Sequence, residues 1–310
     1  PITCASALRL VEQGKLDLQA PLADYMPEFA HLTVDDGVNP PHEAKNPITV
    51  RDLFCMANGY SYEYAFSEHK ISEMQGQPCP TVPTIKQLAK LPLRFEPHTK
   101  FAYGLGHDML AALVEVVSGK KFRDYVKENV FEPLGMVNSH MHVTPDDRGG
   151  RLAAIYQMND GKTSRCPNQE NMHIYGEEYD SGGAGIISNP VDYIKFAMTM
   201  TRRGISPDGS YQLLKPETVD LMRTPQLSDD ERISGGFAGG GYSYGLGVRT
   251  HISPAESGRL SAVGEFGWDG ALGAFVSFDP ANKISIVYVQ SVYNTPHPIN
   301  HKDILNTVYK

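Results

Sequence analysis

The sequence contains little that points to a membrane, a nucleic acid or a disulfide framework. Only four of its 310 residues are cysteine, and they lie far apart without a Cys-x-x-Cys pair, so reduced structural thiols are the default interpretation. No apolar run approaches the length of a membrane span. The 28 Lys and Arg residues and 36 Asp and Glu residues give a net charge of -8 that is spread along the chain, which argues against a nucleic-acid partner.

The composition that remains is that of an ordinary globular protein. Hydrophobic residues make up 41% of the chain and charged residues 21%. A length of 310 residues fits one large domain or two closely packed ones. The first residue is Pro1 rather than Met, so a signal sequence is one of the segments that could precede it. The compartment, cytoplasmic or periplasmic and secreted, therefore stays open, as does the oligomeric state.

Helical patterns dominate the first two thirds of the chain. The clearest lies at residues 106–118, where apolar residues recur at helical spacing and Gly119 follows as a stop. Another lies at residues 48–56, with Thr49 as its N-cap. Further helices are predicted at residues 1–12, 84–90, 122–130, 191–202, 215–223 and 299–309.

Strand patterns begin near residue 235. They predict strands at residues 242–252, 260–266, 274–278 and 283–291. Helices first and antiparallel strands later predict an α+β fold, with an antiparallel sheet flanked by helices and a mainly helical lobe. We expect a single domain over residues 1–310. Its helical lobe is expected at about residues 20–225, and its sheet lobe is expected to combine residues 1–19 with residues 226–310.

A Gly-rich stretch at residues 264–280 is the most informative part of the sheet region. It predicts two strands joined by a turn, and the second strand is apolar on both faces. The glycines around Trp268 let a ligand or another backbone approach closely. Such a strand edge suits an acyl-transfer site, where backbone N–H groups stabilise a developing oxyanion.

The order of these segments resembles the serine β-lactamase and penicillin-binding-protein superfamily in its class C-like branch. That branch also holds D,D-peptidases, family VIII carboxylesterases and related amidases. Each matching motif is weak alone, and their joint order and spacing make the resemblance specific. The motifs are residues 10–18, residues 48–53, Tyr103 with its following helix, residues 133–136, residues 182–186 and residues 267–270.

The resemblance implies three catalytic motifs: Ser-x-x-Lys, Tyr-x-Asn or a variant, and Lys-Thr-Gly or Trp/His-x-Gly. In the family the first motif opens the helix that runs into residues 10–18, so the Lys is expected just before Pro1 and the Ser one turn earlier. Neither residue is in the given chain. Two internal Ser-x-x-Lys matches are interpreted as chance. The match at residues 67–70 is followed by no amphipathic helix, and the match at residues 118–121 ends a helix instead of opening one.

Tyr103 fits the second motif. The resemblance implies a phenol that passes a proton to the leaving group. A free phenol has a pKa of about 10, so it needs a neighbouring Lys cation to act as a base. The motif's third place holds Leu105 instead of Asn, and Leu105 cannot hydrogen-bond a substrate amide. This departure favours an ester over a peptide or a β-lactam. The alternative is a tyrosine packed at a helix entry.

Trp268, Asp269 and Gly270 fit the third motif. A Lys at the first place would attract a substrate carboxylate, whereas Trp268 offers a ring and one N–H donor, as in the esterase branch. Gly270 is expected to keep the strand open to substrate, and the N–H of Ala271 to be the second oxyanion donor. Asp269 would repel anionic substrates if it faced the cavity, although strand alternation can turn it away. The alternative for Trp268 is a core residue.

Metal and phosphate sites receive little support. His140 and His142 precede Asp146 and Asp147, but the remainder of a metallohydrolase pattern is missing, so a surface loop is the preferred interpretation. The glycines of residues 239–241 lack the Lys-Ser/Thr sequel of a phosphate-binding loop. We expect no metal and no cofactor.

These patterns predict a serine hydrolase that works through an acyl-enzyme on a small-molecule ester or amide, with an ester preference. The alternatives are a non-catalytic penicillin-binding or acyl-binding protein, and a β-lactamase or D,D-peptidase. We expect the natural protein to be longer than the given chain and to have N-terminal strands that pair with the C-terminal ones. Residues 1–310 alone are expected to be inactive. The longer form is expected to cleave short p-nitrophenyl esters faster than a chromogenic cephalosporin.

Overall fold

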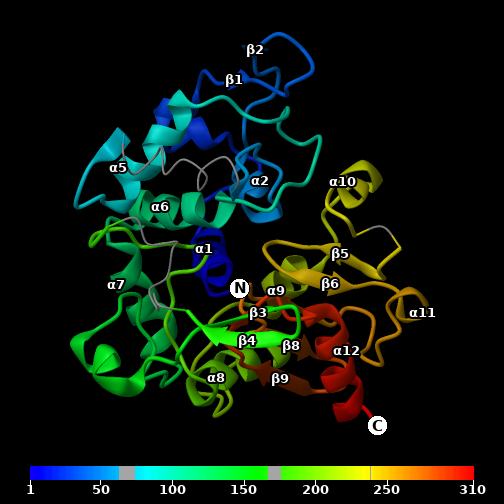
Figure 1. Cartoon of the computed structure of the whole chain (residues 1–310). Helices are drawn as coiled ribbons and strands as arrows, with labels where there is room; N and C mark the ends of the chain where they lie inside the picture. Colours follow the sequence, from blue (N-terminus) through cyan, green and yellow to red (C-terminus); the bar gives the residue numbers. More distant parts are fainter. Residues whose placement is uncertain (63–73, 167–175, 238) are drawn as a thin grey trace.

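A computed structural model describes residues 1–62, 74–166, 176–237 and 239–310. Figure 1 shows helices gathered around the central helix α1 on one side and a sheet on the other. The described α-helices are α1 (Ile2–Glu12), α2 (Val50–Cys55), α5 (Thr81–Lys86), α6 (Gly106–Ser118), α7 (Phe122–Val126), α8 (Pro190–Thr201), α9 (Pro216–Arg223), α10 (Asp229–Ser234), α11 (Pro254–Ser257) and α12 (His297–Val308). Shorter or irregular helical turns are η1 (Leu22–Asp24), η2 (Pro27–Phe29), η3 (Gln87–Lys90), η4 (Lys127–Phe131) and η5 (Asp147–Arg151).

The main sheet has five strands in the order β5-β6-β7-β8-β9, and every neighbouring pair is antiparallel. Its strands are β5 (Tyr242–Tyr244), β6 (Arg249–His251), β7 (Phe266–Asp269), β8 (Phe275–Asp279) and β9 (Ile284–Tyr288). Within the described ranges, β9 pairs with β8 alone and so forms one edge of this sheet. The predicted α+β class with an antiparallel sheet is confirmed.

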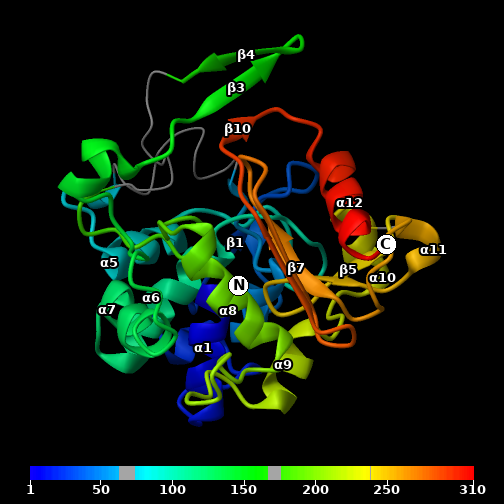
Figure 2. The ribbon, with the colours of Figure 1, turned by 90° about the horizontal axis from the view of Figure 1, so that it is seen from below.

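Two small sheets lie outside the main one. β1 (Thr33–Val34) pairs with β2 (His42–Glu43), while β3 (Tyr156–Asn159) lies between β4 (Lys162–Arg165) and β10 (Val292–Tyr293). The hairpin of β3 and β4 projects from the body of the molecule (Figure 2).

Helix α1 runs through the middle of the molecule because small and apolar residues cover most of its surface. It packs against α6 and α7. Its buried residues are Ile2, Thr3, Cys4, Ala5, Ser6, Ala7, Leu8 and Leu10. The first residues of α1 are therefore fixed by contacts on several sides, which places its N-terminal end firmly.

Helices cover both faces of the main sheet, and strand β8 is apolar toward each of them. Phe278 stacks edge-on against Phe196 of α8, with ring centroids 6.0 Å apart. Phe275 packs with Ile286 and Leu305, the last from α12. Figure 2 shows α8 and α12 on opposite sides of the strands. The prediction that β8 is packed on both sides is confirmed, and the final helix lies on the sheet.

The structure corrects two expectations about these elements. The single strand expected at residues 242–252 is the hairpin of β5 and β6, because Gly247 turns the chain in a left-handed conformation with φ +80°. The strand expected at residues 260–266 begins only at Phe266, because the segment before it is held by side chains, such as Asp279, which accepts from the N–H of Ala262. Helix α8, within the range expected for the helical lobe, packs on β8 and β9. The limits of the two lobes stay a prediction.

Candidate active site

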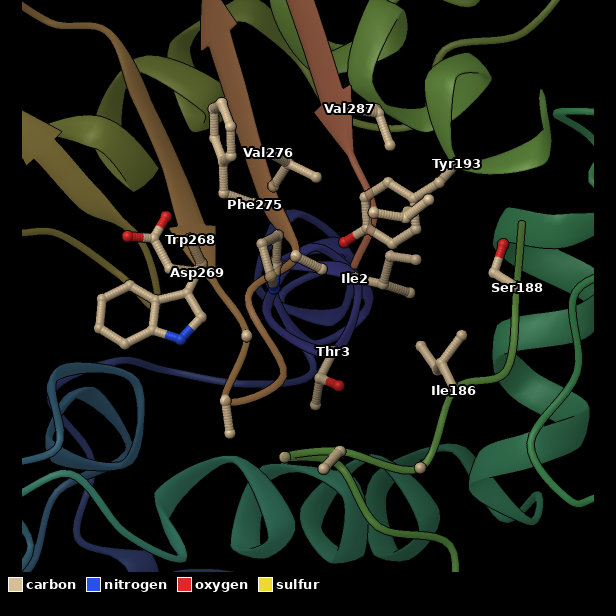
Figure 3. Close-up of a pocket in the computed structure, with 18 of the residues that line it drawn as sticks. Ile2, Thr3, Ile186, Ser188, Tyr193, Trp268, Asp269, Phe275, Val276 and Val287 are labelled. Atoms are coloured by element: carbon tan, nitrogen blue, oxygen red, sulfur yellow. The ribbon is translucent and has the colours of Figure 1, made fainter. Parts of the chain in front are cut away.

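One apolar pocket of about 800 Å³ lies where the N-terminal end of α1 meets the main sheet. Its walls come from segments that are distant in sequence: the first turn of α1, residues 182–189, α8, the turn between β7 and β8, and the end of β9. Figure 3 shows Trp268 on one side of the end of α1, with Tyr193 and Ile186 on the other. Tyr103 and residues 268–271, the residues of the second and third predicted motifs, all line it.

The hydroxyl of Tyr103 accepts a hydrogen bond from the indole Nε1–H of Trp268, at 3.0 Å. The two rings lie 5.2 Å apart at their centroids, and Tyr62 stacks edge-on against Tyr103 at 5.4 Å. Tyr103 as a whole is 39% exposed. Desolvation raises the pKa of its hydroxyl to about 12, although the bond from Trp268 lowers it. The phenol is therefore protonated at neutral pH.

Leu105 does not line the pocket, so its expected contact with substrate is not found. It is 1% exposed and belongs to the main hydrophobic core. Leu105 occupies the N-cap position of α6, and its N–H donates to the carbonyl of Tyr60 at 3.2 Å. This backbone contact directs the apolar side chain into the core instead of toward the pocket.

Asp269 lines the pocket, but its carboxylate is engaged by Arg249. The Arg249 Nη1 donates to the Asp269 Oδ1 at 2.9 Å, and Nη2 donates to Glu265 Oε1 at 3.1 Å. Burial raises the pKa of Asp269, but Arg249 and His301 outweigh it and hold the pKa at about 2. Asp269 is thus an ionised but paired group, which weakens its repulsion of anionic substrates.

A loop at residues 181–185, carrying the predicted Gly-Gly-Ala-Gly motif, closes another wall. Thr3 Oγ1 donates to the carbonyl of Gly182 at 2.6 Å, and Ser181 Oγ donates to Asp108 Oδ1 at 2.7 Å. A Cβ on Gly182 would lie 2.0 Å from the carbonyl oxygen of His107, so only glycine allows this approach to α6. The loop therefore ties the first turns of α1 and α6 to the pocket.

Buried groups beneath the pocket were not identified as site residues from the sequence. Asp108, in the first turn of α6 as expected, is 2% exposed, and burial raises its pKa to about 6 against hydrogen bonds from Ser181 and Tyr179. Cys4 Sγ lies 3.3 Å from His107 Nε2. Burial lowers the pKa of His107 to about 3, so its imidazole is neutral, and burial also raises the pKa of Cys4 to about 12. This thiol is not an activated nucleophile.

The histidines considered as metal ligands have separate partners. His140 Nε2 lies 2.7 Å from Asp147, and His142 Nε2 lies 2.8 Å from Asp180. Among the described residues, no group of three or more His, Cys, Asp or Glu side chains could hold a metal ion. Within the same ranges, no helix is both long and apolar enough to cross a membrane.

The structure describes only one of the two internal Ser-x-x-Lys matches. Ser118 ends α6, as predicted, and the side chain of Lys121 is 52% exposed and lies 3.5 Å from Glu178. The match at residues 67–70 lies outside the described residues.

Comparison with known proteins identifies the family. The family model described as Beta-lactamase matches residues 1–308. The chain belongs to the beta-lactamase family. The predicted family, the predicted fold class and the predicted function as a serine hydrolase that forms an acyl-enzyme are thereby confirmed.

Relatives of this beta-lactamase family member are diverse. Protein Rv1367c of Mycobacterium tuberculosis is 29% identical over 302 residues, covering 93% of this chain and 74% of that protein. Lovastatin esterase of Penicillium rubens is 28% identical over 286 residues, covering 87% of this chain and 69% of the esterase.

Solved structures show the same fold. Simvastatin synthase (LovD) of Aspergillus terreus, as the LovD6 mutant, has a TM-score of 0.78 at 25% identity, covering 99% of this chain and 80% of that one. EstCE1, described as a hydrolase with promiscuous acyltransferase activity, has a TM-score of 0.79 at 23% identity, covering 99% of this chain and 82% of that one.

Proposed function

We propose that this beta-lactamase family member is an esterase that transfers the acyl group of a neutral, apolar small-molecule ester to a serine and then to water. The observation that carries the proposal is the meeting of Tyr103 and residues 268–271 at the N-terminal end of α1, inside one apolar pocket. The lovastatin esterase among the relatives supports an ester substrate.

The nucleophile is assigned to a serine in the turn that leads into α1, with its lysine one helical turn later. Pro1, Ile2 and Thr3 line the pocket, so a helical turn ahead of Pro1 would point into it. A nucleophile at a helix N-terminus gains from the dipole and from free N–H groups that stabilise an oxyanion.

The proposed cycle gives each of these residues a defined role. The serine oxygen attacks the ester carbonyl and gives its proton to the neutral lysine of the Ser-x-x-Lys motif, while the N–H groups of Ala271 and of the serine stabilise the oxyanion. Tyr103 donates its proton to the leaving alkoxide and takes one from the water that attacks the acyl-enzyme, and the lysine returns its proton to the serine oxygen as the acyl bond breaks. The products are a carboxylic acid and an alcohol, and Gly270 leaves room for the reacting carbonyl.

The pocket lining favours an ester over a β-lactam or a D-Ala-D-Ala peptide. Among the described lining residues there is no Lys, Arg or His to attract a substrate carboxylate, and the only charged one is Asp269. Trp268 stands where the Lys of the Lys-Thr-Gly motif would be. A putative D-alanyl-D-alanine carboxypeptidase of Escherichia coli is nevertheless a relative, at 25% identity.

Acyl transfer to an alcohol is a second candidate, favoured by the same apolar walls because they limit the access of water to an acyl-enzyme. Monacolin J acid methylbutanoyltransferase of Aspergillus terreus, a relative at 28% identity over 235 residues, is named for such a reaction. Measuring whether an added alcohol increases ester formation over hydrolysis separates the two activities.

A side-by-side kinetic comparison on the natural protein tests the esterase assignment. We expect kcat/KM for short p-nitrophenyl esters to exceed that for a chromogenic cephalosporin, and Tyr103→Phe to lower ester turnover by at least tenfold. Tyr156→Phe is the matched control, because Tyr156 has nearly the same exposure, 40%, but lies outside the pocket lining. Faster cephalosporin turnover would refute the ester preference, and an unimpaired Tyr103→Phe enzyme would remove Tyr103 from the mechanism.

Labelling with a fluorophosphonate locates the nucleophile and tests the non-catalytic alternative. We expect the label on a serine in the turn that leads into α1. A label on Thr3 or Ser188, which also line the pocket, would contradict the assignment. Labelling without ester turnover would support a protein that only binds acyl groups.

A further inference from the structure

We infer that His301 of α12 is a positioning residue that holds the turn between β7 and β8 in its catalytic geometry. The inference rests on the proposed function, because that turn carries Ala271, the assigned oxyanion donor. His301 is 1% exposed and lies outside the pocket lining, so it acts through the turn and not on the substrate.

His301 contacts the turn at three points. Its Nε2 lies 2.8 Å from the carbonyl oxygen of Gly273, and since a carbonyl only accepts, this nitrogen carries the proton. Its Nδ1 lies 3.5 Å from Asp269 Oδ2, and its ring packs on Phe275 with centroids 4.5 Å apart. One side chain therefore bridges the end of β7, the turn itself and the start of β8.

Contacts from outside the turn, including this bridge, supplement the bonds within it. The N–H of Gly270 donates to Ala274 at 2.7 Å, and that of Gly273 donates to Gly270 at 2.9 Å. These bonds close the turn on itself, but they do not fix it against the rest of the molecule. His301 supplies a contact from α12 at Gly273, Arg249 supplies one through Asp269, and the N–H of Val292 donates to the carbonyl of Leu272 at 3.0 Å.

The position of the turn matters because an oxyanion donor works over a narrow range of distance. A donor must lie about 2.7–3.1 Å from the oxyanion, and the loss of one donor costs roughly 100-fold to 1,000-fold in kcat. A shift of about 1 Å by a distant change can cost roughly 100-fold. Loosening Gly273 should thus lower kcat while leaving KM nearly unchanged, since the apolar walls that bind the substrate stay in place.

Two substitutions of His301 separate the hydrogen bond from the packing. His301→Phe keeps a ring on Phe275 but cannot donate to Gly273, and His301→Gln keeps a donor. In the natural protein we expect His301→Phe to lower kcat for a p-nitrophenyl ester about tenfold with KM within twofold. His301→Gln should recover part of that loss.

Two measurements report on the conformation of the turn without requiring catalysis. Backbone deuterium exchange at residues 269–274 should accelerate in His301→Phe. The fluorescence of Trp268, the single tryptophan of residues 1–310, should also change. His251→Gln is the matched control. His251 lies in β6 and is as buried as His301 of α12, but its Nε2 is hydrogen-bonded to Ser257 instead of to the turn. It should leave kcat, exchange at 269–274 and Trp268 fluorescence unchanged.

Wild-type kcat and wild-type exchange in a folded His301→Phe would overturn the inference, as would equal losses in His301→Phe and His251→Gln. If His301→Phe does not fold, His301→Asn tests the same contact, because its shorter amide does not reach Gly273. A wild-type protein without ester turnover would refute the proposed function instead, and the exchange data would still decide whether His301 holds the turn.

Discussion

The hydrogen bond between Tyr103 and Trp268 joins the two predicted motifs at the level of single atoms. Trp268 Nε1 donates to the Tyr103 hydroxyl at 3.0 Å, so the phenol keeps its own proton for another acceptor. The bond also lowers the pKa of Tyr103, against the larger effect of burial. Trp268 thus orients the proton donor as well as forming a wall of the pocket.

Removing the indole N–H should weaken catalysis without removing the ring. Trp268→Phe keeps an aromatic ring beside Tyr103 but loses the donor, and one hydrogen bond contributes about 1 kcal/mol. We expect kcat/KM for a p-nitrophenyl ester to fall about fivefold. Trp268→Leu should cost more because it also removes the ring contact. Equal activity of Trp268→Phe and wild type would show that the bond has no role in turnover.

Gly270 offers a test of the space kept for substrate. A Cβ at Gly270 would meet Ala274 no closer than 3.6 Å, which is ordinary van der Waals contact. Gly270→Ala should therefore fold with an unchanged Tm while lowering kcat/KM at least tenfold if the substrate approaches this backbone closely. Gly267→Ala is the contrasting variant, because its Cβ would lie 2.0 Å from the carbonyl oxygen of Val276 and should destabilise the sheet. Full activity of Gly270→Ala would place the substrate elsewhere.

At the scale of elements, α6 connects the site to the core. Its first turn carries Asp108 under the pocket, and its last turn carries Glu115, whose Oε1 accepts from the N–H of Phe122 at 2.9 Å at the start of α7. Burial raises the pKa of Glu115 to about 7, although this hydrogen bond lowers it. The helix therefore contains two carboxyl groups whose ionisation opposes folding.

Glu115→Gln should change how stability depends on pH. The unfolded Glu115 ionises near pH 4.5 and the folded one near pH 7, so the protonated group stabilises the fold below pH 4.5, and this stabilisation is lost as pH rises through 7. We expect the variant to exceed wild type in unfolding free energy by on the order of 2 kcal/mol at pH 8.5, with the gap closing toward pH 4.5. Urea unfolding at both pH values measures this difference.

Glu128→Gln provides the control for that measurement. Its side chain is 46% exposed on the segment that follows α7, so its substitution should shift stability little at either pH. A Glu115→Gln difference that does not depend on pH would show that packing, and not ionisation, causes the change.

At the scale of the whole molecule, the pocket exists because three parts of the chain are brought to one point. The buried helix α1 supplies the floor, α8 and residues 182–189 supply one wall, and the end of the sheet supplies the other. The helix α12 lies on the far face of the sheet and contacts the turn between β7 and β8 from outside. Residues from both ends of the chain therefore contribute to the site geometry.

The sequence by itself determined the class of fold and most elements, because these depend on local patterns. Apolar spacing located α6 with Gly119 as its C-cap, and Thr49 caps α2 as predicted. Alternation located β8 with its two packed faces. The sequence also located the motifs around Tyr103 and Trp268, because the resemblance to the family rests on the order and spacing of such motifs along the chain.

Only the tertiary structure decided where side chains point and which distant groups support them. Leu105 holds the third place of the second motif in sequence, yet its side chain packs in the core and does not line the pocket. Asp269 lines the pocket, and Arg249, 20 residues away, engages its carboxylate. No local pattern links His301 to Gly273 or places α8 on the sheet, because such contacts depend on how whole elements pack rather than on the residues beside them.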